Sequence, residues 1–222
     1  MNIVSFLKHI SPRQLGLVIV AIIAIAIFSL KVAVQIHNAR PLHQVSSEFQ
    51  KALATADSDT LYELMPEREK EIFSRDKNKF AALIQWWKEC TNGYVYQDKP
   101  LEQFEFKKDR RGTAEYVIRN QGGQQIVLAM NIVRGTNGPR CFLQPELIMS
   151  GLNAKYRDMG TSSDPSARVW QVLLAGIKKE RARLESIGCS GFDAIRRFEN
   201  WDQFEQHAQK IISSIDGNNS RK

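Results

Sequence analysis

The sequence predicts an α+β protein with one N-terminal transmembrane helix, helices followed by a four-stranded antiparallel meander, and a C-terminal helical extension. Three observations predict this organisation. An uncharged apolar run occupies Gln14–Leu30, near the start of the 222-residue chain. Alternating segments separated by glycine-containing turns fill the middle of the chain, and apolar residues recur at helical spacing on both sides of them.

The apolar run predicts a helix that spans a membrane. Its 17 residues carry no charge and are bracketed by Arg13 and Lys31. At a rise of about 1.5 Å per residue the run is about 26 Å long, and a helix over 14–36 completes the span if Lys31 snorkels. Residues 1–13 then form a short tail. A cleaved signal peptide and a buried helix are the alternatives, although the run exceeds the usual apolar core of a signal peptide.

Positive charge is concentrated around this run. The net charge is +7, and four basic residues precede the first acidic residue, Glu48. They are Lys8, Arg13, Lys31 and Arg40. The remainder is nearly balanced and holds no long basic run, which argues against a nucleic-acid partner. A short N-terminal tail favours a bacterial inner-membrane protein with a periplasmic C-terminal domain, and the acid-free N-terminus leaves the mitochondrial inner membrane as an alternative.

Helical signals follow the apolar run. A helix is expected from Pro41, with Leu42, Val45, Phe49 and Leu53 on one face. Three shorter helices are expected next: one over 60–65 after the N-cap candidates Asp57 to Asp59, one over 67–73 after Pro66, and one capped by Asp76. Thr91-Asn92-Gly93 is the expected stop of the third.

Four strands are expected next, joined by turns short enough to require antiparallel neighbours. They are Leu101–Lys108, Thr113–Asn120, Gln125–Arg134 and Arg140–Ser150. The third is apolar on both faces, which predicts a central strand, and Pro145 in the fourth suggests an edge or a bulge. Helices and strands together form one α+β domain over 41–157.

A second helical region is expected over 164–215. Asp164-Pro165 reads as an N-cap followed by proline at the first helical position. A further helical stretch begins near Phe192, and its aromatic residues are candidates for a partner-binding surface. They are Phe198, Trp201 and Phe204. Residues 216–222 are polar and are expected to be a disordered tail.

The order of these elements resembles a known family. The segments HQVSSEFQKAL, KFAALIQWWKEC, TAEYVIRN and CFLQPELIM, within Pro41–Ser150, resemble the cone fold of ketosteroid isomerase and nuclear-transport-factor-like domains. With an N-terminal anchor, the arrangement is similar to the assembly-factor subunits of type IV secretion machines, although this chain has an additional C-terminal helical region. The resemblance implies a cone-shaped domain, and no active-site residue is carried over from it.

The sequence offers no catalytic constellation, no metal-ligand spacing and no cofactor-binding motif. Four aromatic or sulfur-containing side chains are the candidates for a pocket at the mouth of the cone. They are Trp86, Tyr94, Tyr116 and Met130. Cys90 and Cys141 are candidates for a disulfide across a helix–sheet interface, and three buried thiols are the alternative.

These observations predict a membrane-anchored, non-enzymatic assembly or scaffold subunit. Its expected partners are the membrane and other subunits of a membrane complex. The alternative is a membrane-tethered cone domain that binds a small molecule or a lipid, with or without enzymatic activity. A homo-oligomer is compatible with both. A sensor is disfavoured because few residues precede the apolar run.

Overall fold

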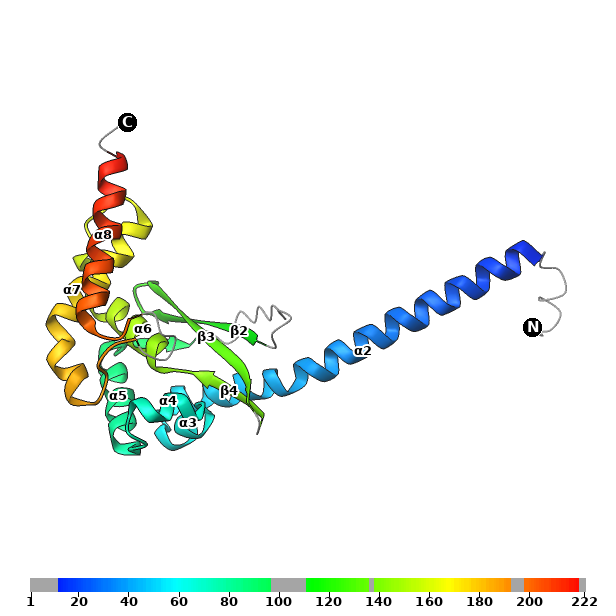
Figure 1. The fold of residues 1–222 in the computed structure, drawn as a ribbon, viewed down its shortest axis with the longest axis horizontal. Coiled ribbons are helices and arrows are strands. Elements are labelled where there is room, and N and C mark those ends of the chain that lie inside the picture. The colour runs from blue at the N-terminus through cyan, green and yellow to red at the C-terminus, as the bar shows by residue number, and fades with distance from the viewer. Residues whose placement is uncertain (1–11, 97–110, 136–137, 193–197, 220–222) are drawn as a thin grey trace. The chain divides into compact units, whose positions relative to one another are not determined.

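A computed structural model describes residues 12–96, 111–135, 138–192 and 198–219 (Figure 1). The chain divides into two compact units, Met1–His43 and Gln44–Lys222. One long helix, α2 (Pro12–Thr55), begins in the first unit and ends in the second. Pro41 lies inside this helix, so the helix expected to begin at Pro41 is a continuation of α2.

The prediction of a transmembrane helix over 14–36 is wrong. Within the ranges that the structure describes, no helix has the length and apolar character needed to cross a membrane. The uncharged run Gln14–Leu30 has 17 residues, fewer than the roughly 20 that a spanning helix needs, and Lys31 follows it directly within α2. The α+β class and the antiparallel four-stranded sheet are confirmed.

Three short helices follow α2 in the second unit. They are α3 (Ser58–Leu64), α4 (Glu67–Ile72) and α5 (Lys77–Cys90). The predicted N-caps are confirmed, because the Asp57 side chain accepts from the backbone N–H of Thr60 and the Asp76 side chain from that of Asn78. The apolar face of α5 is buried, which places its two tryptophans in the core.

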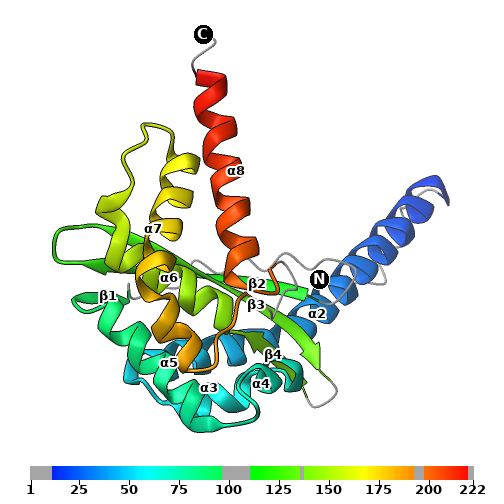
Figure 2. The ribbon, with the colours of Figure 1, turned by 60° about the vertical axis from the view of Figure 1, so that its left-hand side comes forward.

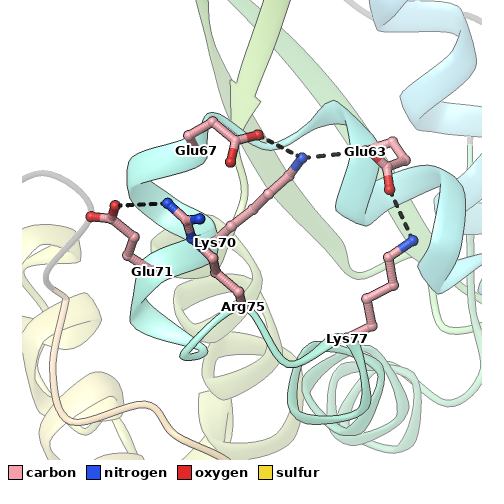
Figure 3. Close-up of polar contacts among 6 residues, drawn as sticks. All are labelled: Glu63, Glu67, Lys70, Glu71, Arg75 and Lys77. Carbon is pink, nitrogen blue, oxygen red and sulfur yellow. Dashed lines mark hydrogen bonds and ion pairs between the residues drawn. The ribbon is translucent and has the colours of Figure 1, made fainter.

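Ion pairs join these three helices at their surface (Figure 3). The Lys70 ammonium lies 3.0 Å from Glu67 and 3.5 Å from Glu63, and Lys77 lies 2.9 Å from Glu63. Both ammonium groups also lie over the ring of Tyr62, at 5.1 and 5.3 Å from its centroid. The Lys77 pair is exposed on both sides and contributes little, whereas the Lys70 side chain is only 9% exposed and reaches exposed carboxylates, so these pairs connect α3, α4 and α5.

The sheet is an antiparallel meander in the order β1-β2-β3-β4. Its strands are β1 (Tyr94–Tyr96), β2 (Arg111–Asn120), β3 (Gln125–Gly135) and β4 (Gly138–Phe142). Two of the predicted strands, over 113–120 and 125–134, are confirmed. The strand expected over 101–108 lies outside the described residues.

The strand expected over Arg140–Ser150 is mostly helix. After β4 ends at Phe142, the chain enters α6 (Gln144–Tyr156). Pro145 occupies the first turn of that helix, where its missing N–H costs nothing, rather than a strand edge. A short 3₁₀ helix, η1 (Arg157–Met159), continues from α6.

Two long helices complete the second unit. The first is α7 (Pro165–Ser186), and its predicted cap is confirmed because Asp164 accepts from the backbone N–H groups of Ser166 and Ala167. The second, α8 (Trp201–Asn219), begins later than expected. It also extends past residue 216, where a disordered tail was predicted.

The core of this unit lies between the sheet and a series of helices in which α5, α6, α7 and α8 each pack on the next (Figure 2). Four even-numbered residues of β3 are buried: Ile126, Leu128, Met130 and Ile132. Two glycines allow the helices to approach closely. A Cβ on Gly151 would lie 2.8 Å from the Trp86 ring, and one on Gly176 would lie 2.8 Å from Leu152.

Candidate functional site

One hollow in the second unit is an open groove of about 680 Å³. Its lining residues come from the β2–β3 turn, the start of β3, the end of α6, η1, the segment after it and the start of α7. The groove is lined by Gln124, Gln125, Ile126, Val127, Asn153, Arg157, Asp158, Gly160, Arg168, Val169 and Val172.

Two arginines give this groove its chemical character. Arg157 donates to the hydroxyl of Tyr94 at 3.4 Å, and Arg168 Nε donates to the carbonyl of Ser162 at 2.9 Å. Neither guanidinium has a carboxylate partner within the described part of the chain. A guanidinium pairs best with a planar anion such as a carboxylate, so the groove favours an anionic group.

The segment that carries these arginines is held by side chain–backbone hydrogen bonds. The backbone N–H groups of Thr161 and Ser162 both donate to Gln171 Oε1, at 2.9 and 3.1 Å. Gly160 lies close to α7, because a Cβ there would be 3.0 Å from the carbonyl oxygen of Arg168. The connection from η1 to α7 is therefore ordered before any ligand arrives, which reduces the entropic cost of binding.

The opposite wall of the groove is formed by β3. Val127 is 54% exposed, although it lies in the interior of a strand, and Val169 of α7 is 43% exposed. Apolar side chains therefore stand beside the two guanidinium groups. This combination is typical of a site for part of a polypeptide rather than for a free inorganic ion.

A buried carboxylate holds the helices behind the groove together. Glu180 of α7 accepts from Lys155 at 2.6 Å, from the Tyr156 hydroxyl at 2.5 Å and from Trp86 Nε1 at 3.1 Å. Burial raises the pKa of Glu180, but these hydrogen bonds outweigh it and leave that pKa below its ordinary value. The pKa of Tyr156 is raised to about 12, by burial first and then by its hydrogen bond to Glu180.

This network has no free acid or base for catalysis. Each oxygen of Glu180 already accepts a hydrogen bond, and its donors come from α5 and from the end of α6. The arrangement ties three helices at one point and so positions Arg157, which directly follows Tyr156. Sequence reasoning missed it because Trp86 and Glu180 are 94 residues apart.

A second buried carboxylate, Glu69 of α4, was also missed. Its side chain accepts from the backbone N–H of Leu143 at 2.8 and 3.0 Å, and from that of Gln144. It therefore caps α6, whose own N-cap residue makes no side-chain hydrogen bond. Burial raises the pKa of Glu69 to about 8, against the lowering effect of these bonds and with a smaller contribution from the charge of Glu146.

The four predicted pocket residues do not line a common cavity. Trp86, Tyr116 and Met130 are buried in the core. Trp86 is bonded to Glu180, and the Tyr116 hydroxyl donates to the carbonyl oxygen of Ser46 in α2. Tyr94 lines a separate hollow of about 360 Å³, whose other residues include Trp87 and Ile118.

The predicted partner-binding aromatics lie mainly inside the unit. Trp201 and Phe204 are 0% and 2% exposed, and each packs on Phe192, with ring centroids 5.1 and 5.0 Å apart. Trp201 Nε1 also donates to the carbonyl of Cys189. Phe198 is half-buried against the same cluster. These side chains hold α8 in place and leave little area for a partner.

The cysteines are three buried free thiols, so the Cys90–Cys141 bridge is not formed. Burial raises the pKa of the Cys90 and Cys189 thiols to about 12, and it also raises the pKa of Cys141. None is activated as a nucleophile. In the part of the chain that the structure describes, no three metal-ligating side chains come together.

Comparison with known proteins adds no relative. No protein-family model matches the sequence, and no curated protein or solved structure shows significant similarity to it. The functional argument therefore rests on the geometry of the groove.

Proposed function

We propose that this chain is a non-enzymatic assembly subunit that binds a partner protein through the groove between β3 and the η1–α7 connection. The observation that carries the proposal is the pair of guanidinium groups, Arg157 and Arg168. They line a pre-formed groove together with exposed apolar side chains, and neither is paired with a carboxylate of the described chain.

The state of the buried polar groups supports a binding role over a catalytic one. Glu180 and Glu69 are both occupied by hydrogen bonds that connect helices. The thiols are buried and have raised pKa values. The acids and thiols in the interior thus serve the fold, and the charged groups that face outward in the groove are suited to recognition.

The test compares two charge-reversal variants of the full chain in its native cells. Arg157→Glu with Arg168→Glu changes the groove, whereas Lys178→Glu with Lys210→Glu makes the same change of charge at exposed positions on α7 and α8. Each chain carries a photo-crosslinking residue at Val127, and crosslinked proteins are quantified by mass spectrometry. Matched melting temperatures of the purified variants establish that both are folded.

We expect one or a few proteins to crosslink at Val127 in the unmodified chain and in the lysine control. The amount of these crosslinked proteins should fall at least tenfold in the arginine variant. Equal crosslinking in all three chains, or none in any, would overturn the proposal.

A further inference from the structure

The edge of β3 beside the groove is only partly covered by its neighbouring strand. β2 pairs with β3 along Gln125–Val133, whereas β4 pairs with it only over Asn131–Gly135. The stretch of β3 before Asn131 therefore has no strand on its β4 side within the described ranges. α6 also packs against β3, and Asn131 donates to Glu146 of α6, so the part of this edge that borders the groove is the stretch around Val127. There the edge offers backbone donors and acceptors to an added strand.

The register shows which backbone groups face that edge. At the β2–β3 turn the N–H of Asn120 donates to the carbonyl of Gln124, so these two residues form a hydrogen-bonded pair. Hydrogen-bonded pairs alternate along an antiparallel ladder. The backbone N–H and C=O groups of the even-numbered residues of β3 therefore point toward β2. The N–H and C=O groups of Val127 and Ala129 consequently face the β4 side, and Val127 also lines the groove.

We infer that an extended, acidic segment of a partner protein adds to the edge of β3 at Val127 and places a carboxylate on Arg157 and Arg168. This inference rests on the proposed function and specifies how the groove is used. Main-chain hydrogen bonds to Val127 provide affinity in strand addition, and side-chain contacts provide specificity.

The occupant is specified by the lining of the groove. Two arginines against the single acid Asp158 give the groove a net positive charge, which selects a segment with carboxylates. The exposed side chains of Val127 and Val169 favour an apolar residue next to the acidic one. The segment is short, because β4 occupies the same edge from Asn131 onward.

The test uses the purified full chain and a displayed library of random heptapeptides. We expect the selected peptides to be rich in Asp and Glu, and selection to be lost with the Arg157→Glu, Arg168→Glu variant but kept with the Lys178→Glu, Lys210→Glu control. The best peptide is then resynthesised with N-methyl groups at alternate residues. One peptide carries the methyl groups on its odd-numbered residues and the other on its even-numbered residues. Methylation of the residues whose N–H groups bond to β3 should weaken binding at least tenfold, and methylation of the residues between them should have little effect.

Hydrogen exchange provides the second measurement, with sodium citrate as a small-anion probe. The peptide should slow exchange of the Val127 and Ala129 amides, whereas citrate should leave it unchanged. Peptides that bind equally well when methylated on either set of residues, or that leave these amides unprotected, would overturn strand addition. Partner crosslinking at Val127 that depends on the arginines, together with a library that yields no binder, would overturn strand addition but leave the proposed function intact.

Discussion

Replacing Glu69 with glutamine should abolish a pH dependence of stability that the unmodified protein shows between about pH 4.5 and pH 8. The carboxyl group is fully buried, and its pKa is raised from 4.5 to about 8. Between these values the folded state holds a proton that the unfolded state has released. The free energy of unfolding therefore falls as the pH rises through this window and levels off above it.

The magnitude follows from the size of this pKa shift. A shift from 4.5 to about 8 corresponds to a loss of about 4 to 5 kcal/mol across the window, as an order of magnitude. Glu69→Gln has no proton to lose but retains an oxygen that accepts from Leu143 and Gln144, so its stability should change far less. Glu69→Ala should cost about 1 to 3 kcal/mol even at pH 5, because those N–H groups lose their acceptor.

The assay is urea unfolding followed by tryptophan fluorescence at intervals from pH 4.5 to 9. The matched control is Glu71→Gln on the same helix, where the carboxylate is exposed and paired with Arg75 (Figure 3). The difference between the curves isolates Glu69, because the other titrating groups are common to all variants. A slope that persists in Glu69→Gln, or that vanishes equally in Glu71→Gln, would refute the reasoning.

Three further predictions concern the packing behind the groove. Glu180→Ala should lower the unfolding free energy by about 2 to 4 kcal/mol, because Trp86 Nε1 and Lys155 lose their acceptor, whereas Trp86→Phe should cost about 1 kcal/mol; urea unfolding measures both. Gly176→Ala should lower stability by about 1 to 2 kcal/mol, because its Cβ would lie 2.8 Å from Leu152 and 2.9 Å from Tyr156, and a melting temperature equal to that of the unmodified protein would contradict this. Thiol titration without reductant should find three reactive cysteines in denaturant and very slow reaction in the native state, and a single reactive thiol in denaturant would show a disulfide instead.

Features with local causes could be predicted from the sequence. The caps Asp57, Asp76 and Asp164 were identified because a capping side chain bonds to backbone only two or three residues ahead. The strands over 113–120 and 125–134 were identified because alternation along one strand reports which face is buried. The resemblance to the cone fold and the cellular compartment stay predictions.

Features that depend on distant residues could not be predicted. The segment after Cys141 was assigned to a strand because Leu143, Leu147 and Ile148 fit a buried strand as well as a helix. The group that stabilises the start of that helix, Glu69, lies 74 residues earlier. The aromatic residues of α8 illustrate the same difficulty, because an apolar stripe does not say whether a partner or the chain itself covers it.

The groove was missed for a related reason. Its arginines belong to η1 and α7, and its opposite wall belongs to β3, so no single stretch of sequence contains the site. A weak signal was present, because Arg157 and Asp158 lie at the boundary between the domain expected over 41–157 and the helical region expected over 164–215, and Arg168 lies in the first turns of that region. Arg157 and Arg168 line the same groove only because α6 packs against α7.

The cap that Glu69 provides for α6 has a consequence for the order in which the chain folds. The N-terminal amides of a helix need acceptors, and those of α6 obtain theirs only after a loop of 74 residues has closed. A nascent chain that has emerged only through β4 has the acceptor but not the helix, and an isolated α6 has the helix but not the acceptor. Stable α6 should therefore form late and at the same time as α4 docks, in a step whose rate is set by long-range closure rather than by helix propagation.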